Sequence, residues 1–380
     1  MNVSIYNASW STFGGGEKYI CTIADVLSRE ERRDITLLID KPFITAEKLR
    51  QFFNLDLSRV RIRRVAHRNI RREMRKADLA FIVSNFKPFG TPGRKTIYIL
   101  QIPYHLITLQ AIAALGIRGD FREAAKDVLR RFLLRDARRA DMVIVYSSFV
   151  QEVLRRDHDL ASEILYPPID DFALGLEKKH AILSVGRFFT GLYNDKRYDI
   201  LIEAFKKLCA RLPDSSWQYW LVGSCGADDR SQRHLAWLRE IATGFPIQFY
   251  VNSPYTELRR LYNQATIFWH AAGYGVDETE YPERMEHFGM STVEAMSASC
   301  APVVINRGGQ KEIVSHGESG YLWNTLEDLV ESTALLMQDR DLLYRVQQCA
   351  RKRFMDFDHD HFVRRLRELV GRKGGVSARS

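Results

Sequence analysis

Cysteine is scarce in this chain of 380 residues, and the few cysteines present are scattered. The five lie at Cys21, Cys209, Cys225, Cys300 and Cys349, with no CxxC pair and no nearby histidine at metal-ligand spacing. An odd and dispersed set argues against a disulfide framework and against a zinc site, and it fits a reducing compartment. We therefore expect a cytoplasmic protein with free thiols.

Long apolar runs are also missing. No apolar run approaches the ~18 residues that a membrane span requires. The first seven residues lack a basic stretch leading into an apolar core, and no small-residue cleavage site follows, so they predict a first strand rather than a signal peptide. The sequence predicts a soluble protein that is at most peripheral to a membrane.

Several catalytic signatures are absent too, including GxSxG, HExxH and the P-loop. An NAD-dependent oxidoreductase would need GxGxxG with an acid about 20 residues later, a spacing that Gly14-Gly15-Gly16 does not supply. Two triplets, Asp157-His158-Asp159 and Asp358-His359-Asp360, match the literal DxD pattern of metal-dependent transferases. Neither follows a recognisable nucleotide-binding strand, which favours solvated surface and no metal.

The composition is that of a globular protein, with 46% hydrophobic and 27% charged residues. Its formal charge of +9 is concentrated in the first half, where the segment Arg61 to Lys76 holds eight basic residues against the single acid Glu73. A second basic segment, Arg118 to Arg139, alternates arginine with apolar residues at helix-like spacing, after the mostly apolar stretch Leu106 to Ile117. The expected basic helices beside an apolar segment are typical of a protein that rests on anionic lipid.

Two other interpretations of this charge stay open. A solvated basic face needs no partner, and nucleic acid is attracted to any such charge because phosphate contacts are generic. Nucleic-acid binding has no support from a zinc finger, an RNP-like aromatic strand or a helix-turn-helix signature. We expect no nucleic-acid partner.

Short apolar runs alternate with helical segments in two series, which indicates buried parallel sheets. The expected strands are Val3–Tyr6, Ile35–Ile39, Leu79–Val83, Thr96–Leu100 and Met142–Tyr146, then Ala181–Val185, Trp217–Val222, Ile247–Val251, Ile267–His270 and Ala301–Ile305. Between the series, Tyr166-Pro167-Pro168-Ile169-Asp170-Asp171 is typical of a rigid connector. A chain of this length exceeds what one core usually serves, so two doubly wound α/β domains are predicted, joined near residue 170.

The most informative stretch is Glu-His-Phe-Gly-Met-Ser-Thr-Val-Glu, which runs from Glu286 to Glu294. It predicts one acid in a loop and one on the helix that follows. Gly289 lets the backbone turn, and Ser291 is expected to cap the helix, whose positive end is an anion site. Glu294 is then placed to accept hydrogen bonds from a ribose diol and Glu286 to hold a second polyol. A capped amphipathic helix with two solvated acids is the alternative.

Three further glycine turns follow strands. Phe13 to Lys18 carries Gly14, Gly15 and Gly16, which present bare amides to a phosphate or a sugar, or simply make a tight turn. Val185-Gly186-Arg187, with Lys196 after it, could neutralise a departing diphosphate, although isolated bases are more often solvated. Gly308-Gly309-Gln310 could line a nucleotide or make a plain turn. Ligands in open α/β sheets bind beyond the carboxyl ends of the strands, so these motifs predict one cleft between the two domains.

Together these motifs resemble glycosyltransferase family 4, of GT-B architecture, in which two Rossmann-like domains face each other across a cleft. The resemblance rests on Glu286-x7-Glu294, the Val-Gly-Arg strand end, Lys196, the Gly-Gly-Gly-Glu turn and the Tyr-Pro-Pro-Ile-Asp linker, in order along nearly the whole chain. The motif style is most similar to the branch of the dolichol-pathway α-1,2-mannosyltransferases. The resemblance implies an acceptor-side domain over residues 1–170, a nucleotide-sugar domain over 171–355, a helix over 356–371 that crosses back to the first domain, and a flexible tail over 372–380.

The resemblance also implies roles for individual residues. Arg187 and Lys196 are expected to hold the donor diphosphate, Glu294 the ribose and Glu286 the hydroxyls of the donor sugar. The remaining donor-side residues that the resemblance implies are Gly15, Gly16, Gly186, Phe288, Gly289, Met290 and Ser291. No cofactor and no metal are implied.

One position departs from the family pattern. The family often has a histidine two residues before a proline in the first domain's cleft, where this chain has Gln101-Ile102-Pro103-Tyr104-His105. Glutamine cannot take a proton. Either His105 substitutes for it, or the step needs no side-chain base because the leaving phosphate deprotonates the acceptor.

The expected function is that of a retaining, metal-independent glycosyltransferase. It would move a hexose from GDP-mannose or a UDP-sugar to a hydroxyl of a glycan or lipid-linked acceptor, in cell-surface glycan synthesis. The basic and apolar surface of the first domain would place it on the inner face of the membrane. A catalytically impaired protein that only binds a nucleotide sugar or lipid is the alternative.

Overall fold

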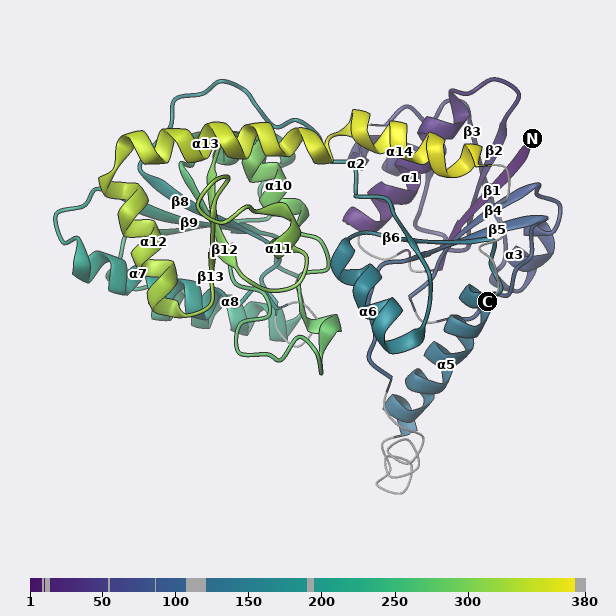
Figure 1. Cartoon of the computed structure of the whole chain (residues 1–380), viewed down its shortest axis with the longest axis horizontal. Coiled ribbons are helices and arrows are strands. Elements are labelled where there is room, and N and C mark those ends of the chain that lie inside the picture. Colours follow the sequence, from purple (N-terminus) through teal and green to yellow (C-terminus); the bar gives the residue numbers. More distant parts are fainter. Residues whose placement is uncertain are drawn as a thin grey trace. The chain divides into compact units, whose positions relative to one another are not determined.

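The computed structural model of the chain describes residues 1–8, 10, 14–53, 55–85, 87–106, 121–189 and 195–372. The chain divides into two compact units, Met1–Pro168 with Phe362–Ser380, and Ile169–His361, so the division falls two residues before the predicted one. Each unit is a parallel sheet with helices on both faces (Figure 1). Among the described residues, no helix has the length and apolar character of a membrane span. Predictions for Phe13, for 107–120 (which includes the start of the second basic segment) and for the tail from 373 concern residues outside these ranges.

The first unit contains a seven-stranded sheet in the order β3-β2-β1-β4-β5-β6-β7, and every pairing is parallel. Its strands are β1 (Asn2–Asn7), β2 (Asp34–Ile39), β3 (Val60–Arg64), β4 (Leu79–Val83), β5 (Lys95–Leu100), β6 (Met142–Val145) and β7 (Glu163–Ile164). The reversal of strand order beside β1 is typical of doubly wound sheets. All five residues of β4 are buried, as a continuous apolar run predicts.

Helices cover both faces of this sheet. They are α1 (Gly15–Ser28), α2 (Ala46–Phe53), α3 (His67–Met74), α5 (Phe121–Arg138), α6 (Ser148–His158) and most of α14 (His359–Gly371). One core cluster joins the sheet to α3, α5 and α6 through buried residues such as Ile70, Leu133 and Val150. The C-terminal helix α14 contacts α1, where the Phe362 and Tyr19 rings lie 5.6 Å apart, and Arg365 bonds to Glu163 at 2.7 Å.

The second unit contains a six-stranded parallel sheet in the order β10-β9-β8-β11-β12-β13. Its strands are β8 (Ala181–Val185), β9 (Gln218–Gly223), β10 (Ile247–Val251), β11 (Ile267–His270), β12 (Ala301–Ile305) and β13 (Tyr321–Trp323). Side chains alternate between the faces. Tyr219 and Leu221 therefore join the larger core cluster, while Trp220 points to the opposite face.

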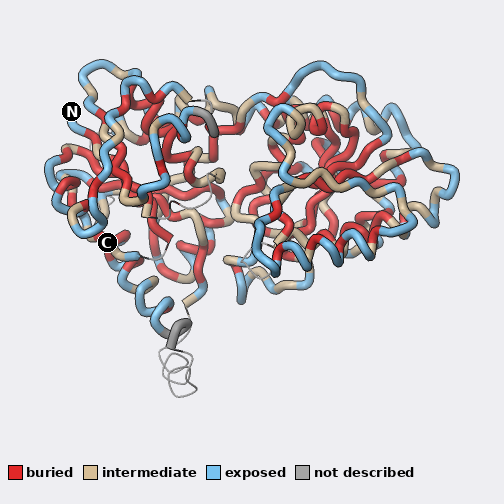
Figure 2. Tube along the Cα trace, turned by 180° about the vertical axis from the view of Figure 1, so that it is seen from behind, coloured by how far each residue is buried: buried red, intermediate tan, exposed pale blue. Residues whose placement is uncertain are grey.

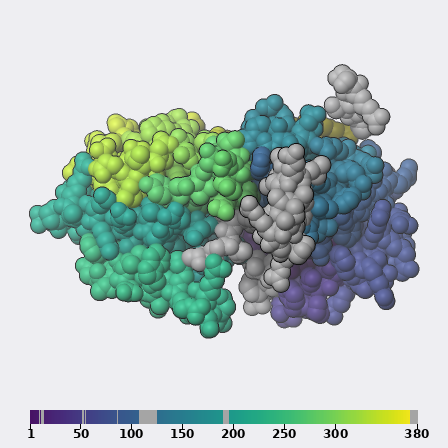
Figure 3. Space-filling view, turned by 90° about the horizontal axis from the view of Figure 1, so that it is seen from below, coloured from purple at the N-terminus to yellow at the C-terminus, as the bar shows by residue number. Residues whose placement is uncertain are grey.

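The helices of the second unit are α7 (Tyr198–Arg211), α8 (Asp229–Ile241), α9 (Tyr255–Gln264), α10 (Met290–Ser297), α11 (Gln310–Ile313), α12 (Leu326–Gln338) and α13 (Arg340–Phe354). Two short 3-10 turns are also present: η1 (Pro282–Arg284) precedes α10, and η2 (Met355–Phe357) follows α13. The α7, α8 and α12 helices cover one face, and α7 and α12 lie side by side on the surface in Figure 3. The α9, α10 and α13 helices pack on the other face. Figure 2 shows the strands buried at the centre of each unit and the exposed loops at its rim.

The prediction missed three strands, β3, β7 and β13. β3 lies inside the basic segment Arg61 to Lys76, so the expectation of helix there is wrong for Arg61–Arg64. Arginines alternate with Ile62 on this edge strand, and an edge position lets the charged side chains reach water. β7 and β13 are only two and three residues long, too short to give a pattern.

Candidate functional site

Polar and glycine residues meet at the carboxyl edge of the second unit's sheet. Gly186 follows β8 directly, and His270 is the last residue of the neighbouring strand β11. Lys196 lies two residues before α7, and Glu286 lies in the loop between η1 and α10. The carboxyl ends of adjacent parallel strands meet at one edge, which is where such sheets bind ligands.

Lys196, Glu286 and His270 form a connected cluster at this edge. The Lys196 ammonium donates a short hydrogen bond to Glu286 Oε2. His270 Nε2 lies 3.0 Å from the same oxygen and 3.4 Å from Lys196 Nζ. The Lys196 and Glu286 side chains are only 17% and 14% exposed, and His270 is 2% exposed. The prediction singled out Lys196 and Glu286 but missed His270.

The charge state of the cluster follows from its surroundings. Burial opposes ionisation of Glu286, but the Lys196 charge and the hydrogen bond from His270 outweigh it and hold the pKa of this carboxyl far below its usual range. Burial and the Lys196 charge lower the pKa of His270, so its imidazole is neutral at pH 7. Because the ionised Glu286 can only accept, the proton of His270 belongs on Nε2. Its Nδ1 is buried with no hydrogen-bond partner among the described residues.

Glycines hold the Glu286 loop in place. The Gly309 amide donates to the Glu286 carbonyl at 2.8 Å. A Cβ on Gly308 would lie 2.4 Å from the Glu286 carbonyl oxygen, and one on Gly309 would lie 2.4 Å from that of Phe288. Since no side chain fits at either position, the Gly308-Gly309 turn is a packing surface for the loop that carries Glu286. Gly186 plays the same part for Lys196, whose Cγ would be 2.8 Å from an added Cβ.

The loop leads into α10, which begins with Gly289 as its N-cap. Gly289 has φ +122°, and no side chain caps the helix. The prediction that Ser291 caps it is therefore wrong, because the chain turns two residues earlier, in a conformation that favours glycine. Glu294 lies in the second turn, where its Oε2 accepts a hydrogen bond from Tyr262 at 2.8 Å. The helix N-terminus thus stands close in sequence to the cluster, with its positive dipole end uncapped by side chains.

Arg187 is not brought into the cluster. Its side chain is exposed, and the guanidinium carbon lies 4.9 Å above the Phe189 ring. Its predicted contact with the donor diphosphate stays a prediction. Phe288, by contrast, is buried and packs its ring 5.5 Å from that of Phe357, while Met290 and Ser291 are partly exposed at the start of α10.

The candidate residues of the first unit also gather at the carboxyl edge of their sheet. Gly15 and Gly16 are the first residues of α1 rather than part of a loop, so their predicted place is corrected. Glu17 caps this helix by accepting from the Gly14 amide at 3.0 Å, which makes a helical start favourable. A Cβ on Gly16 would lie 3.1 Å from the Gln101 amide. The glycine thus leaves room for the Gln101 side chain.

Gln101 is anchored by two neighbours. Its amide nitrogen contacts the Tyr146 hydroxyl closely, and its carbonyl accepts from Asn85 at 3.1 Å. Burial raises the pKa of Tyr146 well above its ordinary value, so this phenol is neutral. His105 is half exposed and lies 3.4 Å from Asp157, in the first DxD-like triplet. Among the described residues, no group of three or more histidine, cysteine, aspartate or glutamate side chains could hold a metal ion.

The second unit is similar in sequence to a known protein family. Residues 168–353 match the family described as glycosyl transferases group 1, a range that contains Lys196, Glu286 and Glu294. The match covers nearly the whole of the second unit, and we refer to residues 168–353 as the group 1 domain. The chain is 29% identical to the human GDP-Man:Man(3)GlcNAc(2)-PP-Dol alpha-1,2-mannosyltransferase over 221 residues. This alignment covers 53% of this chain and 42% of the human protein. It is 27% identical over 284 residues to mannosylfructose-phosphate synthase of Agrobacterium fabrum, covering 66% of this chain and 59% of that enzyme. The matches therefore span less than two thirds of these relatives' own lengths.

Solved structures show the fold of the whole chain. A glycosyltransferase from Rickettsia africae superposes with a TM-score of 0.69 at 14% identity, covering 98% of this chain and 99% of that one. Anabaena HepE in complex with UDP and glucose gives a TM-score of 0.65 at 15% identity, covering 97% and 99%. With the two parallel sheets, these likenesses show the GT-B fold around the group 1 domain, as the sequence predicted.

Proposed function

We propose that the protein is a retaining glycosyltransferase that moves a hexose from a nucleoside-diphosphate sugar to a hydroxyl of a glycan or lipid-linked acceptor. The observation that carries the proposal is the Lys196–Glu286–His270 cluster beside the N-terminus of α10, inside a group 1 glycosyl transferase domain. A cation and a helix N-terminus suit a diphosphate, and an ionised carboxylate suits sugar hydroxyls.

The relatives favour GDP-mannose or a UDP-sugar as the donor. The human relative's name gives GDP-mannose, and the structural relative from Anabaena binds UDP and glucose. Glu294 would accept hydrogen bonds from the ribose hydroxyls, in the orientation that the Tyr262 hydroxyl gives it. Arg187 would swing from Phe189 to the diphosphate.

In the proposed reaction the bond between the sugar's anomeric carbon and the diphosphate oxygen breaks, and a bond to the acceptor oxygen forms on the same face. The acceptor's proton passes to the leaving phosphate. Lys196 and the N-terminus of α10 stabilise the negative charge that builds up on that phosphate. Glu286 holds the sugar by its hydroxyls. Gln101 cannot act as a base, since an amide does not take a proton at neutral pH.

The proposal is tested by incubating the purified protein with GDP-mannose, UDP-glucose and UDP-N-acetylglucosamine, and by following nucleotide release with and without glycan or polyprenyl-diphosphate-linked acceptors. We expect release with one donor and an acceptor, and an α-linked product from an α-linked donor by NMR. A product of inverted configuration would contradict retention. Donor binding without any release would favour the alternative, a catalytically impaired binding protein.

We further propose that the first unit rests on an anionic membrane surface. On α5 the exposed apolar residues Val128, Leu129 and Phe132, each about 40% exposed, accompany Arg131 and Arg135 on the same helix. Apolar and basic side chains together are typical of helices that bind the lipid interface.

Co-sedimentation with vesicles tests the membrane part of the proposal. We expect the protein to sediment with phosphatidylglycerol vesicles at low salt and not with phosphatidylcholine vesicles. Phe132→Ala should weaken this binding, whereas Leu335→Ala, at a similarly exposed leucine of α12, should not. Equal binding to both kinds of vesicle would refute the electrostatic part.

A further inference from the structure

A pocket lies in the group 1 domain, at the end of the sheet opposite to the Lys196–Glu286–His270 cluster. Its volume is about 520 Å³. Lys179 comes two residues before β8, and Gln218 is the first residue of β9, so the pocket lies at the amino ends of these strands. The cluster lies beyond the carboxyl ends. The proposed transferase reaction therefore leaves this pocket unexplained.

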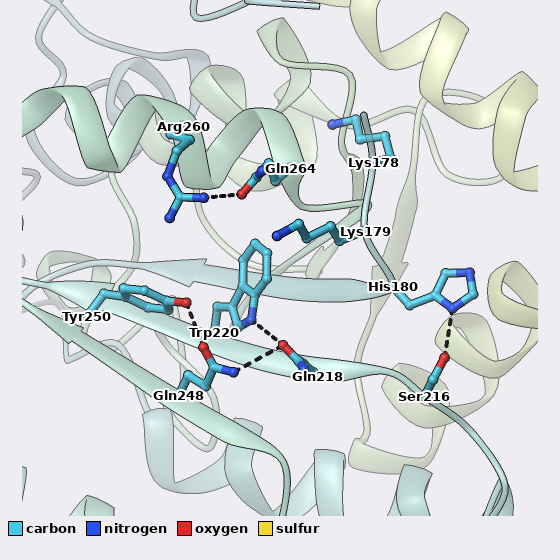
Figure 4. A pocket seen from close by; sticks show the side chains of 10 residues that line it. All are labelled: Lys178, Lys179, His180, Ser216, Gln218, Trp220, Gln248, Tyr250, Arg260 and Gln264. Carbon is cyan, nitrogen blue, oxygen red and sulfur yellow. Dashed lines mark hydrogen bonds between the residues drawn. The ribbon is translucent and has the colours of Figure 1, made fainter. Parts of the chain in front are cut away.

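The floor of the pocket is one face of strands β9 and β10. Gln218 and Trp220 alternate along β9, Gln248 and Tyr250 alternate along β10, and Gln248 is paired with Trp220 in the register. Residues two apart on a strand share a face, so these four side chains point the same way. Figure 4 shows the indole of Trp220 rising from this face, with the side chains of α9 above it and Lys179 reaching toward the same space.

The hydrogen bonds on this floor fix the direction of each glutamine amide. The Trp220 indole N–H donates to Gln218 Oε1 at 3.1 Å. Because an indole can only donate, the Gln218 carbonyl must face it, and the Gln218 NH2 group is left for the pocket. Gln248 donates to the same oxygen at 3.1 Å and accepts from the Tyr250 hydroxyl at 2.6 Å.

The helix side of the pocket has the same polarity. Arg260 donates a short hydrogen bond to Gln264 Oε1 and a second, through Nε, to Glu257 at 2.7 Å. A guanidinium can only donate, so the Gln264 carbonyl faces Arg260 and its NH2 group is left for the pocket. Glu257 balances the charge of Arg260. Lys179 is exposed and adds an ammonium to the lining.

All three glutamine carbonyls are thus engaged within the protein, while two NH2 groups and an ammonium remain to serve a ligand. We propose that this pocket binds a sugar that carries an oxyanion, either a sugar phosphate or a uronic acid. Donors with a net positive charge select an acceptor-rich anion. The volume is larger than a bare phosphate requires and lies in the range of small-molecule sites.

Fluorine NMR of the protein labelled with 5-fluorotryptophan gives a readout at the pocket itself. The Trp220 resonance is assigned by its loss in Trp220→Phe, and the protein is titrated with glucose 6-phosphate, glucuronate and glucose. We expect glucose 6-phosphate or glucuronate, or both, to shift this resonance in a saturable manner, and the stronger of the two distinguishes the phosphate from the carboxylate. Glucose should not shift it. Equal effects of glucose and the anions, or no effect of any, would refute the proposal.

Variants test which groups hold the anion. Lys179→Ala should weaken binding at least roughly fivefold, since it removes a charged donor. Gln264→Glu keeps an acceptor for Arg260 but replaces the NH2 group by a negative oxygen, so it should abolish binding. Lys207→Ala, at an exposed lysine of α7, is the matched control and should bind as the wild type does.

The donor site could also attract these anions, and one variant separates the two sites. Lys196→Ala should leave the shift of the Trp220 resonance unchanged. If Lys196→Ala abolishes the shift while Lys179→Ala preserves it, the anion binds at the cluster and the pocket proposal is wrong. The shift of the Trp220 resonance does not depend on transferase activity. The pocket proposal and the proposed function can therefore fail independently of each other.

Discussion

Lys196 and Glu286 are 90 residues apart in the chain and share a hydrogen bond from which water is largely excluded. Their partner His270 bonds to the same carboxylate oxygen. A partly buried carboxylate with two donors on one oxygen is held in a fixed orientation. A diphosphate that reaches Lys196 must compete with Glu286 for the ammonium, so donor binding and the position of Glu286 are coupled.

Replacing Glu286 by glutamine should slow transfer far more than it weakens donor binding. The change removes the carboxylate that we propose holds the sugar, and it leaves the Lys196 charge uncompensated. We expect the rate to fall roughly 10²–10³-fold, the usual effect of losing one preorganised electrostatic contact, with donor affinity changed by less than about tenfold. Calorimetry with the donor and steady-state kinetics measure the two quantities. Glu280→Gln, at an exposed acid of the preceding loop, is the control and should behave as the wild type.

Replacing Glu294 should give the opposite pattern. Hydrogen bonds to a charged group contribute about 1.5–3 kcal/mol, so Glu294→Gln should weaken donor binding roughly tenfold or more while the rate at saturating donor changes little. Tyr262→Phe removes only the hydroxyl that orients Glu294 and should weaken binding by a smaller factor, about fivefold. If Glu286→Gln and Glu294→Gln change the rate and the affinity alike, the division of roles is wrong.

The sequence predicted most strands of both sheets because they are continuous apolar runs, which only a buried strand between helices explains well. The prediction missed β3, because its three arginines leave only Val60 and Ile62 as apolar residues, too few for an apolar run. The local motifs predicted Lys196 and Glu286 as site residues. They could not predict the hydrogen bond between the two, because the residues are 90 positions apart in the chain. His270 was read as the end of a strand; a histidine at the carboxyl end of a buried parallel strand is itself a sign that could have found it.

The start of α10 shows a different limit. A serine two residues after a glycine predicts a serine cap, because serine is a favoured N-cap residue. The structure makes Gly289 the cap, as the Gly308-Gly309 turn lies against the preceding carbonyls. The position of a turn is decided by the surface it packs against, which is more than 15 residues away in the chain and is not part of the local pattern.

Gly289→Ala should therefore damage the site. Besides the strain of a positive φ, its Cβ would lie 2.9 Å from both the Gln310 amide nitrogen and Ile313 Cδ1. We expect a loss of about 1–3 kcal/mol of unfolding free energy and a strong loss of donor binding. Gly244→Ala is the matched control, because Gly244 also has positive φ but no atom within 4 Å of an added Cβ. Urea unfolding of both variants separates crowding from backbone strain, and equal losses would refute the crowding argument.

Removing metal ions should not change the proposed activity. Lys196 and the N-terminus of α10 would supply the positive charge that metal-dependent transferases obtain from a cation. We expect the transfer rate after dialysis against EDTA to stay within about twofold of the untreated rate. Added Mg²⁺ or Mn²⁺ should not raise it. A rate that falls with EDTA and is restored by either ion would contradict this prediction.

His270 should make the protein less stable in mild acid. Burial and the Lys196 charge lower its pKa in the folded state below the ordinary 6.5. Below pH 6.5 the unfolded chain therefore takes up a proton that the folded chain refuses, so unfolding becomes easier as the pH falls, by at most about 1.4 kcal/mol per pH unit for one group. Glu286 acts in a lower range: its depressed pKa adds stability above pH 4.5 that is lost only as the pH falls below that value.

Urea unfolding at pH 7.5, 6.5 and 5.5 should show that the free energy of unfolding falls less with decreasing pH in His270→Gln than in the wild type. The variant should retain part of the slope, because burial also lowers the pKa of His287 and His234. A slope as steep in His270→Gln as in the wild type would mean that His270 accepts its proton in the folded state, and that the neutral imidazole assigned to the cluster is wrong.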